Sequence, residues 1–506
     1  MENKETVQLA LTWSEQKVFD GKSFDDKLTL DGIPLGWFYK KFFLPNVIPQ
    51  YVNPTKFICM KKKMNLFYRT YFSLNARLLP LLLLFKERRK MKVCHPVQSD
   101  DNSKVLFLSY SNHVMPDGKI FRLQNIIDDI EKDKQIIPLV LFAEPLSSSI
   151  SVKNTVYQYC SDVLVNTARA ESKALKHCLE QLPQKELSDA FSIGGTSVFK
   201  EYAAAYRMYF SRQFLFVLCL TYQLCKSILD KEKIRAIVLT SPNSIMERCL
   251  IAAASKKKIP VIVIQHGIGM GRLVDKRIPV HFAVFGDFHA QQLLKNGALA
   301  EQVHKVGPVI FDDIINHQAK QEKVILIATA PIVEDNECSK TQYFTRVETI
   351  LKQISSIADV TIVVKLHPRE RYWKEYAKII SRHHLSNVAL RDQRTPREEF
   401  YRLMGICSSF VHFGTTAALE VMILNKPVVT INLRDSEVNS PLSWLEDASI
   451  FLNYNEDIKS AVERSLKNEQ SLQLKRKKYI QQFCGKVDGK SHLRVAQLIY
   501  SLTCQK

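Results

Sequence analysis

Residues 408–429, SSFVHFGTTAALEVMILNKPVV, decide the fold class of this chain. An apolar run ends at Phe413, Gly414 permits a close turn, and an Ala- and Leu-rich stretch leads to a second apolar run. Apolar strands separated by a helix are typical of parallel strands buried on both faces. The segment therefore predicts a β-α-β unit, with strands at 408–414 and 427–433 and a helix at 415–424.

The same rhythm extends to both sides of this segment. Further strands are expected at 105–110, 136–142, 162–166, 236–240, 260–265, 281–286, 324–329, 360–367 and 387–390. Helices are expected at 340–357, 371–383 and 396–405, with one or two long helices within 186–231. This alternation predicts an α/β protein made of two Rossmann-like, doubly wound domains that face a cleft.

The expected domain boundaries follow from changes in sequence texture. The first Rossmann-like domain, on the acceptor side, is expected at 101–316 and the second, on the donor side, at 317–485. Residues 486–506 are expected to form a helix that packs back across the first half, and residues 1–100 form a basic, partly apolar N-terminal extension.

The composition excludes several classes of protein. With 506 residues the chain is too long for one core, and 46% apolar with 24% charged residues excludes a disordered chain. The net charge of +20 favours an anionic partner. The 11 cysteines form no C-x-x-C pair, and no signal-peptide core or membrane-length apolar run is present, so a cytoplasmic location is expected.

Residues 56–92 carry eleven basic side chains around the short apolar run LLPLLLLF at 78–85. One interpretation is a segment lying on an anionic membrane surface, with the protein peripheral on the cytoplasmic membrane face. The other is a buried helix with a solvated basic rim. Nucleic acid is not expected as a partner, because few aromatic residues are interleaved with the cations.

Candidate binding residues follow the ends of the predicted strands in the second half. Thr415 or Thr416 is a natural N-cap after Gly414, and the free N–H groups there would form an anion site. Glu420, one turn later, is placed to bind a ribose. In VVKLHPRE, Lys365 and His367 share one face at a strand end, where a histidine donates well to a phosphate oxygen.

The first half has its own strand-end candidates. Gln265, His266 and Gly267 follow a buried strand, and Arg272 stands where a dinucleotide fingerprint would need its third glycine. His266 is the expected general base, because it titrates near neutral pH. Asp117 is the alternative base.

His113 is a further candidate in the cleft. No histidine, cysteine or carboxylate set has the spacing of metal ligands, so no metal and no cofactor is expected.

Four segments carry a resemblance to a known family: FAVFGDFHAQQLLKNGALAEQVHKVGPVIFDD, VVKLHP, HFGTTAALEVMILNKPVV and VDGKSHLRVAQLI. Together they resemble GT-B fold transferases of surface and capsular polysaccharides, in the neighbourhood of CDP-glycerol glycerophosphotransferases and bacterial polysialyltransferases. More distantly they resemble UDP-N-acetylglucosamine 2-epimerases.

The resemblance implies a metal-independent glycosyltransferase that moves a sugar from a nucleotide-sugar to a surface polysaccharide or lipid-linked glycan. It implies that His367, Thr415 and Thr416 contact the donor phosphates, that Glu420 binds the donor ribose, and that His266 is the base. The alternatives are a CDP-glycerol-type glycerophosphotransferase, a nucleotide-sugar 2-epimerase, and a non-enzymatic basic protein that binds nucleic acid or membrane.

Overall fold

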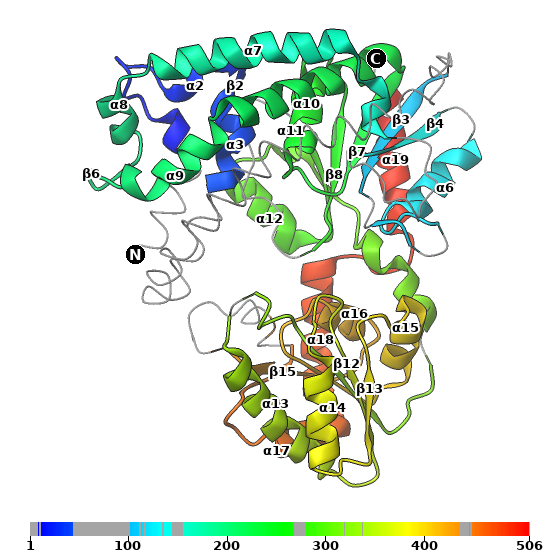
Figure 1. The fold of residues 1–506 in the computed structure, drawn as a ribbon. Helices are drawn as coiled ribbons and strands as arrows, with labels where there is room; N and C mark the ends of the chain where they lie inside the picture. The colour runs from blue at the N-terminus through cyan, green and yellow to red at the C-terminus, as the bar shows by residue number, and fades with distance from the viewer. Residues whose placement is uncertain are drawn as a thin grey trace.

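The computed structural model describes residues 9, 12–43, 102–110, 113–115, 118–133, 136–143, 155–267, 280–317, 319–335, 337–434, 445 and 448–504. Within these residues the chain forms two α/β units, one above the other in Figure 1, each built on a six-stranded parallel sheet. The 3-10 helix η6 (Val309–His317) leads from the first sheet to the second.

The first sheet has the strand order β10-β9-β8-β7-β3-β4. Its strands are β3 (Lys104–Ser109), β4 (Ile137–Phe142), β7 (Ile234–Leu239), β8 (Val261–Ile264), β9 (His281–Val284) and β10 (Val303–Lys305). Its main helices are α6 (Gln124–Asp133), α7 (Asp162–Glu180), α10 (Arg212–Lys231), α11 (Ile245–Lys256) and α12 (Asp287–Lys295). Five of the six strands predicted before residue 300 are confirmed, and the three-residue β10 was not predicted.

The strand predicted at 162–166 is wrong, because this segment is the first turn of α7. The Ser161 side chain accepts a hydrogen bond from the Leu164 amide and caps the helix. The buried residues Val165, Ala168, Ser172, Leu175 and Leu179 recur at helical spacing. A short β-branched run was therefore mistaken for a strand.

The interval 186–231 is more divided than the sequence predicted. It contains the end of α8 (Gln184–Asp189), a hairpin of β5 (Ser192–Ile193) and β6 (Thr196–Ser197), α9 (Phe199–Tyr209) and α10. Gly194 and Gly195 both have positive φ and make the tight hairpin turn. One of the expected long helices is confirmed as α10.

The second sheet has the order β13-β12-β11-β14-β15-β16, which is the Rossmann order 3-2-1-4-5-6. Its strands are β11 (Val324–Ala328), β12 (Thr361–Lys365), β13 (Val388–Arg391), β14 (Ser409–His412), β15 (Val428–Asn432) and β16 (Ile450–Asn453). Its helices are α13 (Lys340–Ser355), α14 (Trp373–Arg382), α15 (Arg397–Ile406), α16 (Ala417–Ile423) and α17 (Ile458–Lys467). All predicted elements of this half are confirmed; β16 and α17 were not predicted.

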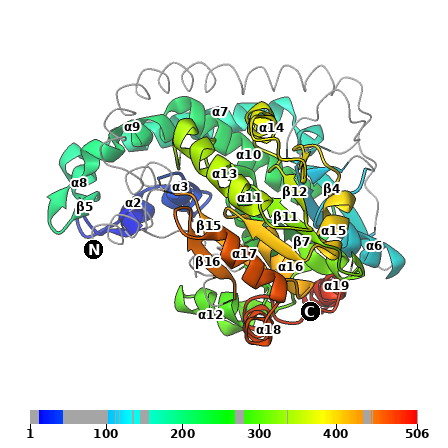
Figure 2. The same cartoon turned by 90° about the horizontal axis from the view of Figure 1, so that it is seen from below.

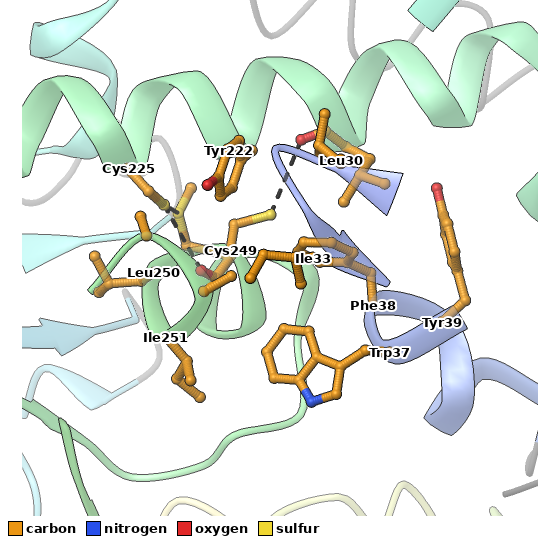
Figure 3. Close-up of a cluster of buried hydrophobic side chains, with 14 of the residues drawn as sticks. Leu30, Ile33, Trp37, Phe38, Tyr39, Tyr222, Cys225, Cys249, Leu250 and Ile251 are labelled. Carbon is orange, nitrogen blue, oxygen red and sulfur yellow. Dashed lines mark hydrogen bonds between the residues drawn. The ribbon is translucent and has the colours of Figure 1, made fainter. Parts of the chain in front are cut away.

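Part of the N-terminal segment belongs to the core of the first unit. Its elements are η1 (Trp13–Glu15), α2 (Phe24–Lys27), β1 (Thr29–Leu30), β2 (Ile33–Pro34) and α3 (Leu35–Phe43). The Trp13 ring stacks on Phe191 with ring centroids 4.6 Å apart. Figure 3 shows Trp37 and Phe38 beside Tyr222 and Cys249 of the first unit. The aromatic residues of 13–39 are therefore core residues, whereas the basic segment 56–92 lies outside the described residues.

Two C-terminal helices return to the first unit. Helix α18 (Gln470–Cys484) runs beside α12 (Figure 2). Phe483 of α18 stacks on Phe288 of α12 with ring centroids 5.1 Å apart. Helix α19 (Ser491–Cys504) packs on α6 and β7, and it buries Val495 and Ile499 in the cluster that holds Val105. In Figure 1 this red helix lies within the upper unit.

Among the described helices, none combines the length and the apolar character that crossing a membrane requires. Eight of the cysteines within the described part of the chain, from Cys160 to Cys484, are free thiols.

Candidate functional site

His412 organises the loop between β14 and α16. The imidazole is fully buried, and Thr430 Oγ1 lies 2.8 Å from its Nε2. Its Nδ1 accepts hydrogen bonds from the backbone N–H groups of Gly414 (3.2 Å) and Thr415 (3.3 Å). Since Nδ1 is an acceptor, Nε2 carries the proton and donates to Thr430. Burial, followed by the nearby Arg434, lowers the pKa of His412 to about 3, so the ring is neutral.

Gly414 has a φ of +118°, which a residue with a side chain rarely adopts. The predicted N-cap is found at Thr416, but its side chain makes no capping bond and the residue is exposed. The Thr415 Oγ1 accepts from the Ala417 amide at 3.3 Å. The backbone N–H groups of Gly414 and Thr415 are therefore both engaged by His412.

His367 lies two residues beyond the end of β12, on a loop fixed by Glu370. The His367 amide donates to Glu370 Oε2 and to Thr329 Oγ1, both at 2.9 Å. On the imidazole, Nδ1 accepts from the Arg369 amide at 3.2 Å. Burial and the cations Arg369 and Lys365 lower the pKa of His367 to about 4. At neutral pH the ring is therefore uncharged, with its proton on Nε2.

Glu370 itself is buried at the centre of a hydrogen-bond network. The hydroxyls of Tyr376 (2.9 Å) and Tyr343 (3.4 Å) donate to Oε1, and Thr329 donates to Oε2. Burial raises the pKa of Glu370 to about 7. The network ties the loop after β12 to β11, α13 and α14, so the position of His367 is set by packed elements.

The ends of three neighbouring strands are joined by backbone bonds. Thr329 N, after β11, donates to Lys365 O of β12, and Phe413 N, after β14, donates to Ala328 O of β11. Because β11 lies between β12 and β14, His367 and Gly414 follow strands about 10 Å apart. The two predicted phosphate-binding segments thus share one edge of the second sheet.

Lys365 is buried, and its ammonium donates to the Leu366 carbonyl and lies 5.5 Å from the centroid of the Phe400 ring. Burial lowers the pKa of this lysine. These contacts direct the Lys365 side chain toward α15, and its charge also acts on the nearby His367.

Glu420, the predicted ribose ligand, is paired within its own unit. Its Oε1 lies 3.2 Å from the Tyr401 hydroxyl and 3.4 Å from Arg397 Nη2. Burial raises the pKa of Glu420 to about 7, although Arg397 acts in the opposite direction. To bind a ligand, the Glu420 carboxylate would have to give up its contacts with Tyr401 and Arg397.

Arg397 also reaches the other unit. Its guanidinium donates to the Ile310 carbonyl of η6 at 3.2 Å and lies 4.3 Å from the centroid of the Phe121 ring, just before α6. Residues that follow strands of the two sheets therefore meet at the boundary between the units.

In the first unit, Gln265 has a structural role. The side chain is fully buried, its Oε1 accepts from Phe285 N and its Nε2 donates to Gly267 O, both at 2.9 Å. It thus holds the turn after β8 and cannot also face the cleft. His266, next to it, is partly exposed. Among the described residues, no atom lies within 4 Å of a Cβ built at Gly267.

The remaining first-unit candidates are less closely placed. His113 is partly buried, and its ring centroid lies 5.6 Å from that of Tyr110. Asp117 and Arg272 lie outside the described residues. Across the described ranges, no group of three or more histidine, cysteine or carboxylate side chains is arranged to hold a metal ion.

Sequence reasoning missed three residues that organise this edge: His412, Glu370 and Arg397. Glu370 could have been found from the sequence. An acidic residue three positions after His367 can accept a hydrogen bond from the His367 backbone amide, as it does here. His412 gave a weaker one, a polar residue in a buried strand. Arg397 had none, because its partners come from distant segments.

No protein-family model matches the chain, and no curated protein sequence matches it. Solved structures are similar in fold. A UDP-N-acetylglucosamine 2-epimerase from Neisseria meningitidis bound to UDP-GlcNAc has a TM-score of 0.47 at 12% identity, covering 80% of this chain and 100% of that one. A putative UDP-N-acetylglucosamine 2-epimerase from Listeria monocytogenes has a TM-score of 0.49 at 12% identity, covering 79% and 96%. HepE from Anabaena, in complex with UDP-glucose, has a TM-score of 0.40 at 14% identity, covering 79% and 98%.

The topology described above defines the class. Two parallel sheets are wound with helices, and loops that follow their strands meet at the boundary between the units. This is a GT-B-like α/β protein with two Rossmann-type units.

Proposed function

We propose that this protein is a glycosyltransferase that transfers a sugar from a nucleotide-sugar donor to a surface polysaccharide or lipid-linked glycan. The observation that carries the proposal is the state of His367. Its Nδ1 is occupied by the Arg369 amide, so the neutral ring has Nε2–H available as a donor. A neutral donor held in place suits a donor phosphate, whose negative charge grows as the glycosidic bond breaks.

The loop after β14 would hold the rest of the donor. The Thr415 and Thr416 side chains and the backbone at Gly414 lie on the same sheet edge as His367, and His412 keeps this loop in one conformation. Glu420 would bind the ribose after leaving Arg397 and Tyr401. A preorganised hydrogen-bond donor such as the His367 Nε2–H contributes on the order of 3 kcal/mol to transition-state stabilisation.

The first unit would supply the acceptor side. His266 follows the carboxyl end of β8, and we assign it the role of base that removes the acceptor hydroxyl proton. Asp117 is the alternative for this role. The bond to the leaving nucleotide phosphate breaks while the acceptor oxygen bonds to the anomeric carbon.

A binding experiment tests the proposal. Thermal unfolding is followed with UDP, CDP, CMP, GDP and ADP in EDTA, for the wild type, His367→Ala and the exposed control His177→Ala. We expect one nucleotide to stabilise the wild type and His177→Ala by about 2.7 kcal/mol at 100 times its Kd. His367→Ala should lose most of this effect. If no nucleotide binds, the proposed function is wrong.

A second experiment separates the reaction classes. Incubation with a nucleotide-sugar alone would give an altered nucleotide-sugar from an epimerase, whereas a transferase needs an acceptor glycan. Turnover of CDP-glycerol in place of a nucleotide-sugar would identify a glycerophosphotransferase.

A further inference from the structure

Two guanidinium groups from different units lie close to one aromatic ring. The Cζ of Arg122, just before α6 in the first unit, lies 4.7 Å from the centroid of the Phe121 ring. The Cζ of Arg397, the first residue of α15 in the second unit, lies 4.3 Å from the same centroid. Like charges are therefore held close together at the boundary between the units.

Arg122 has no counter-charge among the described residues. Its Nε is buried without a hydrogen-bond partner, and within the described ranges no carboxylate forms an ion pair with it. Burial, together with the charge of Arg397, lowers the pKa of Arg122 to about 10. Arg122 is part-buried, and a cation whose buried Nε lacks a hydrogen-bond partner is unfavourable and is rarely retained without a reason.

The backbone at Arg122 is strained as well. Its φ is +75°, a left-handed conformation that costs on the order of 1 kcal/mol for a residue other than glycine. Such strain persists where the surrounding structure fixes it and is found mainly at functional sites. Here it holds the side chain over Phe121.

Arg397 is only partly neutralised. Its Nη2 lies 3.4 Å from Glu420 Oε1, and it donates to the neutral Tyr401 hydroxyl and to the Ile310 carbonyl. Burial raises the pKa of Glu420, which weakens that single counter-charge near neutral pH. The pair of arginines thus carries at most one opposing carboxylate.

We propose that Arg122 and Arg397 together form a phosphate-binding site at the boundary between the two units. A guanidinium binds phosphate oxygens through two parallel hydrogen bonds, and a phosphate with several oxygens serves two arginines at once. The bound anion replaces the repulsion between the two cations by attraction to each. Since each arginine belongs to a different unit, the anion also links the units.

This site adds to the proposed function a phosphate contact that uses neither His367 nor the loop after β14, although Arg397 also pairs with Glu420, the residue assigned to the ribose. The phosphate has two possible sources in that setting, a nucleotide or a phosphorylated acceptor, and the chemistry of the site is the same for both. Inorganic pyrophosphate is a probe that depends on neither source.

The test is isothermal titration of pyrophosphate into the full chain. We compare the wild type with Arg122→Gln, Arg397→Gln, His367→Ala and Arg402→Gln, the last being an exposed arginine on the same helix as Arg397. We expect Arg122→Gln and Arg397→Gln each to weaken binding roughly tenfold or more. Arg402→Gln should bind as the wild type does, whereas His367→Ala should lose only binding at the donor site and keep the binding that depends on the two arginines.

Several results would overturn the inference. They are the absence of pyrophosphate binding to the wild type, an unchanged affinity in either Arg122→Gln or Arg397→Gln, and a loss confined to His367→Ala. A parallel titration with glucuronate tests which class of anion the two arginines bind. If glucuronate binds and pyrophosphate does not, the site binds carboxylates and the phosphate inference is wrong. Circular dichroism checks each fold, and Arg397→Lys, which keeps the charge but loses the planar fork, substitutes for Arg397→Gln if that variant is unfolded.

The same set of variants distinguishes the proposed donor site at His367 from the phosphate site at Arg122 and Arg397. If pyrophosphate binds through the two arginines while no nucleotide depends on His367, the phosphate site stands and the proposed donor site fails. The opposite pattern supports the donor site and overturns this inference. Competition with pyrophosphate then identifies the source of the phosphate. Displacement by UMP would indicate a nucleotide, and displacement by glycerol 1-phosphate would indicate a phosphorylated acceptor.

Discussion

His412 Nε2 and Thr430 Oγ1 lie 2.8 Å apart inside the second sheet, and this contact fixes which nitrogen of the histidine faces the Gly414 loop. Thr430 in turn donates to Ser449 Oγ at 2.9 Å. A chain of buried hydroxyls thus sets the conformation of a loop to which we assign donor binding.

Replacing Thr430 by valine tests this arrangement. Thr430→Val keeps the shape but leaves the buried His412 Nε2–H without an acceptor, so we expect a loss of about 1–3 kcal/mol in unfolding free energy. Urea unfolding measures it. Thr345→Val, at an exposed position of α13, is the control and should change stability little. Equal stability of the two variants would contradict the assigned hydrogen bond.

Glu420 gives a pH dependence with a defined sign. Its folded pKa of about 7 is above the unfolded value of 4.5, so the folded chain binds more protons between these pH values and stability falls as pH rises through them. Glu420→Gln should show a decline that is smaller by at most about 3 kcal/mol, while Glu370, whose pKa burial raises to about 7, keeps its own part of the decline. Unfolding free energies at pH 4.5 and pH 8 measure it. Glu398→Gln, at an exposed position of the same helix as Arg397, should retain the decline.

Asp312 joins η6 to α19. Its carboxylate accepts from Ser491 N at 3.1 Å and from His492 N and Nδ1 at 2.8 Å each. We expect Asp312→Ala to lower the unfolding free energy by about 1–3 kcal/mol, since it removes a cap and leaves buried amides unpaired. The neighbouring Asp313→Ala is the control, because the hydrogen bond of Asp313 to the Asn125 side chain is exposed to solvent. Equal losses would show that the cap does not matter.

The Asp312 carboxylate also predicts how the free energy of unfolding depends on pH. Asp312 raises the pKa of His492 above its usual value, so this contribution is fully present below pH 6.5 and is lost as pH rises through the folded pKa. In Asp312→Ala the loss of stability should therefore be larger at pH 6 than at pH 8.5.

The base assignment makes a kinetic prediction. Once a donor is known, His266→Ala should lower kcat by a factor of about 100 to 10,000 with donor Kd unchanged, because proton removal is lost and donor contacts are not. Asp117→Ala should have a small effect. The reverse result would transfer the role to Asp117, and two active variants would contradict both assignments.

The basic segment 56–92 makes a prediction about membranes. Neutralising Lys61, Lys62, Lys63, Arg88, Arg89 and Lys90 should release the protein from anionic liposomes in a sedimentation assay, since each cation near such a surface contributes about 1 kcal/mol. The control neutralises six exposed lysines elsewhere: Lys173, Lys185, Lys231, Lys258, Lys320 and Lys352. Unchanged sedimentation of the first variant would support a buried helix with a basic rim instead.

The second sheet was predictable because each of its first five strands is a continuous apolar run bounded by polar or turn residues. The error at 162–166 shows the limit of that signal: five residues cannot distinguish a strand from the first turn of a helix. The burial of Trp13 and Phe24 was not predictable either, since their partner Phe210 is almost two hundred residues away.

At the site, residue types at strand ends located His367 and Gly414, because parallel strands present their carboxyl ends at one edge. The partners of these residues were not predictable. Arg397 meets Phe121 only through the packing of two units, and nothing in the local sequence of either residue indicates the other.

Helix α19 has a consequence for the order of events during synthesis. Val105 of β3 is made early, whereas Val495 and Ile499, which cover the same apolar cluster, are made nearly four hundred residues later. The first sheet emerges from the ribosome with one part of its face uncovered and keeps it so until the second sheet has been translated. Such long-range contacts slow folding and leave apolar surface exposed meanwhile. A nascent chain that stalls before residue 491 is therefore expected to need a chaperone even though both sheets are already present.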